Sequence, residues 1–180
     1  MAGEGAGGLL RHPPGPQAAA WRKMTADDLS DLCRLAGRIH PGLPEDAAVF
    51  EERLSLFPAG CFVLSAEGGL AGYAIAHPIR FPEPPKLNTL LGAIARDADA
   101  FYLHDVAVAP EHRGRRHAET VVARLIDAAA DFPRICLVSV YGTAPFWRRF
   151  GFADASGNVA PHALSGYGPD ARFMVRLTPD

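Results

Sequence analysis

A short basic turn between two apolar segments is the part of this 180-residue chain whose residue types best suit binding chemistry. The stretch from Asp105 to Leu125 reads DVAVAPEHRGRRHAETVVARL, and its basic turn runs from Arg113 to Ala118. A turn that leads into a helix points free backbone N–H groups and the positive end of the helix dipole at one spot. Arginine side chains add positive charge there. The stretch therefore predicts an anion site, and phosphate is the anion that suits it best.

The apolar segment before the turn carries two side chains that can move protons, His104 and Asp105. A histidine titrates near neutral pH, which suits a general base. Alternation along a strand predicts that His104 shares a face with Tyr102 and Val106, and that Asp105 points to the other face. A hydrogen-bonded core histidine explains His104 equally well, and a structural carboxylate is the favoured interpretation of Asp105.

Composition excludes several other classes of function. The net charge of −2 and the ordinary apolar content give no sign of nucleic acid or of an anionic membrane as a partner. His112 and His117 have no neighbouring carboxylate or thiolate cluster, so we expect no metal site. Three cysteines far apart in apolar surroundings, and no signal-like or membrane-spanning segment, predict a cytoplasmic protein with reduced thiols.

Apolar periodicity places the elements that must position these residues. Strands are predicted around 19–24, 61–66, 70–79, 100–109, 134–140, 151–155 and 171–178. Helices are predicted from Thr25 to 39, across 44–57, from the basic turn to 129, and across 144–150, with a further short helix within 87–95. The glycine-rich segment 156–170 is predicted to have little structure of its own. This order favours a single α/β domain over 19–180, behind a flexible leader over 1–18.

The layout and two motifs resemble the GNAT superfamily of acyl-CoA-dependent N-acetyltransferases, over roughly residues 21–178. The signature turn falls on RGRRHA, residues 113–118, although Arg116 stands where the family has glycine. The second motif is APFWRRFGF, residues 144–152, with Trp147 where most members have tyrosine. Together with His104, these motifs are most similar to the arylalkylamine N-acetyltransferase branch. The resemblance implies a central, mixed, mostly antiparallel twisted sheet of about seven strands flanked by four helices.

The resemblance also implies acetyl-CoA as co-substrate and direct acetyl transfer to a primary amine. The coenzyme would contact backbone groups of the strand, the basic turn and the second motif: Val106, Ala107, Val108, Arg113, Gly114, Arg115, Arg116, His117, Ala118, Phe146, Trp147 and Arg149. His104 is the leading base, with Asp105 the weaker choice. An indole N–H does not titrate usefully, so Tyr141 becomes the nearest candidate to protonate the departing thiolate.

The acceptor is predicted to be a small-molecule amine that enters beside the first helix. Segments 38–46, 80–100 and 156–170 are expected to line its pocket. The motifs do not specify which amine it is, and a homodimer is left open. The missing tyrosine also keeps a second interpretation in play, in which the protein is a non-catalytic acyl-CoA-binding sensor or regulatory module.

Overall fold

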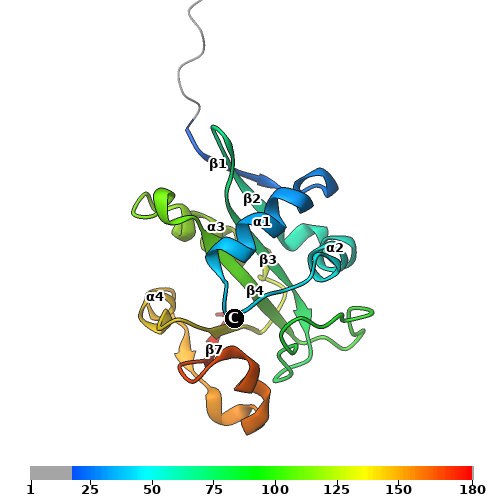
Figure 1. The fold of residues 1–180 in the computed structure, drawn as a ribbon. Helices are drawn as coiled ribbons and strands as arrows, with labels where there is room; N and C mark the ends of the chain where they lie inside the picture. The colour runs from blue at the N-terminus through cyan, green and yellow to red at the C-terminus, as the bar shows by residue number, and fades with distance from the viewer. Residues whose placement is uncertain (1–17, 180) are drawn as a thin grey trace, which may run out of the picture.

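Seven strands pair into one twisted sheet in the computed structural model, which describes residues 18–179 (Figure 1). The strands are β1 (Ala20–Lys23), β2 (Cys61–Ala66), β3 (Gly69–Ile79), β4 (Ala100–Val108), β5 (Arg134–Ser139), β6 (Ala153–Asp154) and β7 (Arg172–Leu177). Their spatial order is β1-β2-β3-β4-β5-β7-β6. Every neighbouring pair is antiparallel except β4 and β5. The predicted mixed, mostly antiparallel seven-stranded sheet is thus confirmed.

Four α-helices cover the two faces of this sheet. They are α1 (Leu29–Ile39), α2 (Ala47–Leu56), α3 (His117–Ala128) and α4 (Ala144–Arg148). Leu32 of α1 and Phe50 of α2 pack with Tyr73 on one face. Val121 and Leu125 of α3 belong to the core of the opposite face. Each helix buries its apolar stripe against β-branched and aromatic residues of the sheet, as an amphipathic helix must.

Two connecting segments differ from the sequence-based expectation. No helix forms within 87–95, because side chains of α2 bind the backbone groups that a helix would pair internally. Glu52 accepts the N–H groups of Leu91 and Gly92, and Arg53 donates to the carbonyl of Thr89. The segment 156–170 was expected to be irregular but contains two 3₁₀ helices, Ser156–Asn158 and Pro161–Tyr167.

The central strand β4 contains a bulge at His104. Asp105 pairs with Ile75 of β3, while the next residue of β3, Ala76, pairs with Leu103, so His104 is an extra residue in β4. A bulge of this kind resets the alternation of side chains along the strand. At the bulge, β4 therefore presents the successive residues His104 and Asp105 to the same face of the sheet, whereas a regular strand would present only one of them.

The predicted leader, 1–18, lies outside the described residues except for residue 18. No helix in the described part of the chain is both long and apolar enough to cross a bilayer.

Candidate active site

The parallel strands β4 and β5 pair over only part of their length and then diverge. Their pairing runs from Phe101 opposite Ile135 to Leu103 opposite Leu137 and stops there, although both strands continue. The edge of β4 beyond Leu103 is therefore unpaired on the side that faces β5. Ala107 does not contribute to this edge, since its carbonyl lies against Gly72 of β3. In an extended strand the groups of Val106 and Val108 point the other way, into the opening.

The basic turn lies at the mouth of this opening and leads into α3. Gly114 and Arg116 both have positive φ, 75° and 63°, so the turn needs two left-handed residues. Within the described residues, no backbone carbonyl or side chain accepts from the N–H groups of 114 through 119. These free donors stand at the positive end of a helix of 12 residues. The geometry is that of an anion cradle.

The arginines of the turn differ in what they contact. Arg113 folds back and donates from Nε to the carbonyl of Val108 at 3.0 Å. Arg113 and Arg116 both line the cavity described below, whereas Arg115 does not. Arg116 adopts the left-handed conformation although it stands where the signature has glycine.

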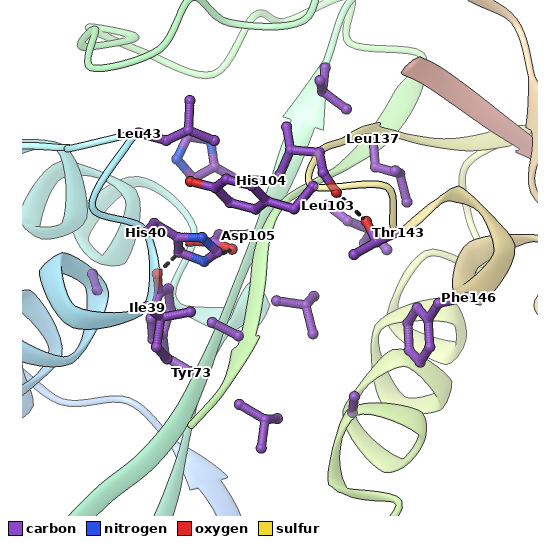
Figure 2. A pocket seen from close by; sticks show the side chains of 18 of the residues that line it. Ile39, His40, Leu43, Tyr73, Leu103, His104, Asp105, Leu137, Thr143 and Phe146 are labelled. Atoms are coloured by element: carbon purple, nitrogen blue, oxygen red, sulfur yellow. Dashed lines mark hydrogen bonds and ion pairs between the residues drawn. The ribbon is translucent and has the colours of Figure 1, made fainter. Parts of the chain in front are cut away.

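One cavity of about 840 Å³ joins the basic turn to the polar residues of β4. This volume is typical of a site for a small molecule or cofactor. All three predicted acceptor segments contribute to its wall, through residues 39–45, Leu87 and Tyr167. Figure 2 shows the arrangement: His40, Asp105, Tyr73 and His104 lie on the α1 side of β4, and Phe146 lies across the opening beside α3.

The bulge brings His104 and Asp105 to the same cavity, which corrects the expectation that they point to opposite faces. Beyond the bulge, Asp105 and Ala107 lie on the α1 side, because Ala107 packs in the core beneath α1. Val106 packs with the α3 core, so His104 and Val106 do not share a face. A period-two pattern cannot foresee this reset.

His104 lies at hydrogen-bond distance from Glu45, a residue of the connection between α1 and α2. Nε2 of His104 lies 2.9 Å from Oε2 of Glu45. The two side chains are only 4% and 7% exposed, so the contact is shielded from solvent. Nδ1 of His104 is buried and has no partner among the described residues. Its ring lies 5.7 Å, centroid to centroid, from His77, whose pKa burial lowers to about 3.

Asp105 forms a second pair with His40 of the α1–α2 connection. Its Oδ1 lies 3.4 Å from Nε2 of His40, and its Oδ2 accepts from the hydroxyl of Tyr73. Burial works to lower the pKa of His40, but the hydrogen bond and charge of Asp105 outweigh it, and the pKa is raised. Burial also works to raise the pKa of Asp105, yet His40 and Tyr73 bring it below its ordinary value. The site thus holds two histidine–carboxylate pairs.

The remaining predicted residues line the far wall of the cavity. Tyr141 is 55% exposed and stacks on the His40 ring at 5.6 Å. Burial, with the charge of Asp105, raises its pKa. Trp147 is buried and packs edge-on against Phe146 and Phe152. The guanidinium of Arg149 lies over the ring of Phe146.

Three residues of this site carry no motif signal: His40, Glu45 and Tyr73. Glu45 and His104 are 59 positions apart in the chain, and only the fold brings them together. The segment 38–46 was predicted to line the acceptor pocket, but no spacing within it singles out His40 or Glu45 as a partner for the strand. Among the described residues, no group of three His, Cys, Asp or Glu side chains is arranged to hold a metal ion.

The splayed parallel strands, the free N–H groups of the basic turn and the two histidine–carboxylate pairs meet at one cavity. The sequence model of the Acetyltransferase (GNAT) family matches residues 23–152, and the chain belongs to this family. It is therefore an acyltransferase by family. A search of curated proteins finds no significant match.

Solved structures share the fold at low sequence identity. The loading GNATL domain of CurA from Lyngbya majuscula superimposes with a TM-score of 0.70 at 15% identity, covering 88% of this chain and 96% of that domain. The GphF GNAT-like decarboxylase, solved with isobutyryl-CoA, has a TM-score of 0.66 at 22% identity, covering 89% and 100%. The ribosomal-protein-S18-alanine N-acetyltransferase of Escherichia coli has a TM-score of 0.61 at 17% identity, covering 91% and 96%.

Proposed function

We propose that this protein is an acetyl-CoA-dependent N-acetyltransferase that acts on a primary amine by direct transfer. The observation that carries the proposal is the single cavity that joins the basic turn to two histidine–carboxylate pairs across the opening between β4 and β5. One end suits the pyrophosphate of coenzyme A, and the other end suits proton removal from an amine. Within the family, the motifs RGRRHA and APFWRRFGF with His104 favour the arylalkylamine branch.

The residues present fit coenzyme A. The N–H groups from 114 through 119 donate to no acceptor among the described residues, and a pyrophosphate would satisfy them. Arg113 and Arg116 add positive charge on the cavity side, while Arg115 does not line the cavity. The backbone groups of Val106 and the N–H of Val108 offer a strand edge to the pantetheine arm, while the carbonyl of Val108 already accepts from Arg113. When bound, acetyl-CoA supplies an activated acetyl thioester.

The base in this proposal is the His104–Glu45 pair. An amine attacks only in its neutral form, so a group near neutral pH must take its proton. Both partners line the cavity, and each holds the other at hydrogen-bond distance, 2.9 Å. The proton from the amine is therefore assigned to the pair, reached directly or through one water.

Protonation of the departing thiolate is assigned to Tyr141. Trp147 cannot serve, because an indole N–H donates a hydrogen bond without giving up its proton. The raised pKa of Tyr141 keeps its hydroxyl protonated at neutral pH. Tyr141 lines the cavity and stacks on His40, whose own raised pKa favours the cationic form beside Asp105.

The acceptor end of the cavity combines carboxylates with apolar walls. Glu45 and Asp105 favour an incoming cation. Leu43, Leu87 and Tyr167 line the same cavity and suit an apolar or aromatic substituent. This combination supports a small arylalkylamine as the acceptor.

We also propose that the protein is cytoplasmic. All three cysteines are free, and Cys61 and Cys136 are buried. Burial raises the pKa of both thiols to about 12, which keeps them protonated and unreactive. A reducing compartment suits such thiols.

A panel assay tests the transferase proposal against the sensor alternative. The protein is incubated with acetyl-CoA and a panel of arylalkylamines, polyamines and amino acids, and free thiol and acetylated amine are measured together. We expect equal amounts of both products with at least one arylalkylamine. Tight acetyl-CoA binding without free thiol across the panel would overturn the proposal and support the sensor.

A further inference from the structure

A turn at Asn88 binds the two acidic residues that precede α2. The backbone N–H of Asn88 donates to Oε1 of Glu45 at 3.2 Å. Its side-chain Oδ1 accepts from the N–H of Asp46 at 2.7 Å, and its Nδ2 donates to Oδ2 of Asp46 at 3.0 Å. The other oxygen of Glu45, Oε2, lies 2.9 Å from Nε2 of His104. One carboxylate therefore joins Asn88 to the strand histidine.

The backbone at Asn88 is left-handed, with φ of 55°. Asparagine tolerates this conformation better than most residues other than glycine. The conformation lets the N–H and the side chain of one residue reach Glu45 and Asp46 together. Asn88 is therefore suited to this position by both its backbone and its side chain.

The segment that carries Asn88 is fixed to α2 by further bonds. Glu52 accepts from the N–H groups of Leu91 and Gly92 at 2.7 and 2.8 Å. Arg53, whose side chain is fully buried, donates to the carbonyl of Thr89 at 2.7 Å. Because these bonds anchor the residues directly after Asn88, the partner that Glu45 meets has a defined position.

Among the described residues, the Glu45 carboxylate has hydrogen bonds only with His104 and Asn88. It lies in a connection without regular structure, and its side chain is 7% exposed. A buried carboxylate is costly unless its oxygens are hydrogen-bonded. The bonds given above from His104 and Asn88 each take one of its two oxygens.

We propose that Asn88 is a positioning residue: its side chain binds Asp46 and so places its backbone N–H against Glu45, which holds Glu45 against His104 and fixes the orientation of the imidazole. The effect on catalysis rests on the proposed function, in which the His104–Glu45 pair is the base. The orientation itself does not depend on the reaction, and it can be measured without turnover.

The variant Asn88→Asp tests the proposal with the smallest change in shape. It keeps the side-chain size and the tolerance for positive φ but replaces the donor to Asp46 with a second carboxylate, so like charges repel. Asn88→Gly is the milder companion: it keeps the backbone conformation and the N–H to Glu45 and loses only the side-chain bonds. Asn158→Asp is the matched control, since Asn158 is exposed and does not line the cavity.

The first readout is the ¹⁵N spectrum of the His104 ring in the full chain, at about pH 9 where a free imidazole is neutral. In the wild type we expect a single tautomer with the proton on Nε2, facing Glu45. Asn88→Asp is expected to give a mixture of tautomers, Asn88→Gly a smaller shift, and Asn158→Asp no change. A wild-type His104 signal in both Asn88 variants would overturn the proposal.

The second readout separates this inference from the proposed function. With an accepted amine, Asn88→Asp is expected to lower kcat on the order of 10- to 100-fold, the scale set by small misplacements of a catalytic group. The KM for acetyl-CoA is expected to stay within about twofold, because the coenzyme cradle is untouched. If the His104 signal moves while kcat does not, Asn88 does position the pair and the pair is not the base.

Discussion

At the scale of single residues, the site depends on pairs of side chains. His104 is matched with Glu45 and His40 with Asp105, and all four line the same cavity. The sequence points to His104 and Asp105 because both stand on the strand before the basic turn. It does not point to their partners, since only the long-range packing of the α1–α2 connection against β4 creates these contacts. A hydrogen-bonded pair of this kind holds the imidazole in one orientation, which a lone histidine on a strand lacks.

Removing either member of the base pair is expected to abolish most of the transfer rate. His104→Ala and Glu45→Gln should each lower kcat/KM for the amine by roughly 10²- to 10⁴-fold, the usual contribution of general base catalysis. Binding of acetyl-CoA should be unchanged in both, as measured by calorimetry. His162→Ala is the control, because His162 is exposed in the 3₁₀ helix Pro161–Tyr167 and does not line the cavity. A normal rate for His104→Ala between about pH 6 and 9 would show that the base is another group.

The His40–Asp105 pair predicts a pH-dependent contribution to stability. A raised pKa means that His40 stabilises the fold fully below its unfolded value, about 6.5, and that this contribution is lost as the pH rises through the folded value. The lowered pKa of Asp105 sets the other limit, because its contribution is lost as the pH falls through the folded value. The stabilising window therefore lies between the two folded values.

Urea unfolding of the wild type and His40→Gln across this range measures the effect. The difference in unfolding free energy should be largest in weakly acidic solution and should shrink toward alkaline pH. In an Asp105→Asn background the same comparison should lose its pH dependence. A difference that grows with rising pH would contradict the pairing.

At the scale of elements, two local irregularities build the site. The bulge in β4 turns His104 and Asp105 toward one cavity, and the left-handed turn before α3 aims free N–H groups at its other end. The turn could be predicted from the sequence, because its glycine and arginines precede an amphipathic helix. The bulge could not, since residues 100–109 read as one continuous strand with nothing to mark an extra residue at His104. The regular strands and helices set the location of the site, while the bulge and the left-handed turn orient its side chains and N–H groups.

Arg116 is expected to destabilise the fold slightly through its left-handed backbone while adding positive charge to the cavity. A non-glycine residue with φ of 63° is unfavourable, so Arg116→Gly should leave the unfolding free energy unchanged or raise it by up to about 1 kcal/mol. The same change should weaken coenzyme A binding, because Arg116 lines the cavity. Arg115→Gly is the matched control: it should lower stability by about 0.5 kcal/mol and leave coenzyme binding alone. Urea unfolding measures the stability of both variants, and calorimetry measures their binding of coenzyme A. Weaker binding in Arg115→Gly alone would refute the assignment of Arg116 to the coenzyme site.

The short helix α4 can be tested through its tryptophan. Trp147→Tyr should keep or raise the transfer rate, because it adds a titratable hydroxyl on the cavity wall, while the melting temperature falls through lost packing. Trp21→Tyr makes the same chemical change at a tryptophan of similar burial that does not line the cavity. If Trp147→Tyr slows transfer more than Trp21→Tyr does, Trp147 itself has a role in the reaction.

At the scale of the whole molecule, the sheet organises the function. The seven-stranded sheet and its four helices could be predicted because apolar runs, prolines and glycines mark their limits along the chain. The sequence predicts three segments that line the acceptor pocket. It does not predict the contacts between their side chains, which depend on long-range packing. Asn88 illustrates the point: a short helix is predicted within 87–95, but the left-handed backbone of Asn88 presents its N–H to Glu45 instead.

In the proposed function, one cavity joins a coenzyme A site at the start of α3 to an acid–base site at the bulge of β4. The most direct measurement is a crystal structure of the full chain with coenzyme A and an accepted amine. The account predicts pyrophosphate density on the N–H groups from 114 through 119, the pantetheine arm along Val106 and Val108, and the amine beside His104 and Glu45. Coenzyme density away from the turn at Arg113, or an amine bound outside this cavity, would contradict it.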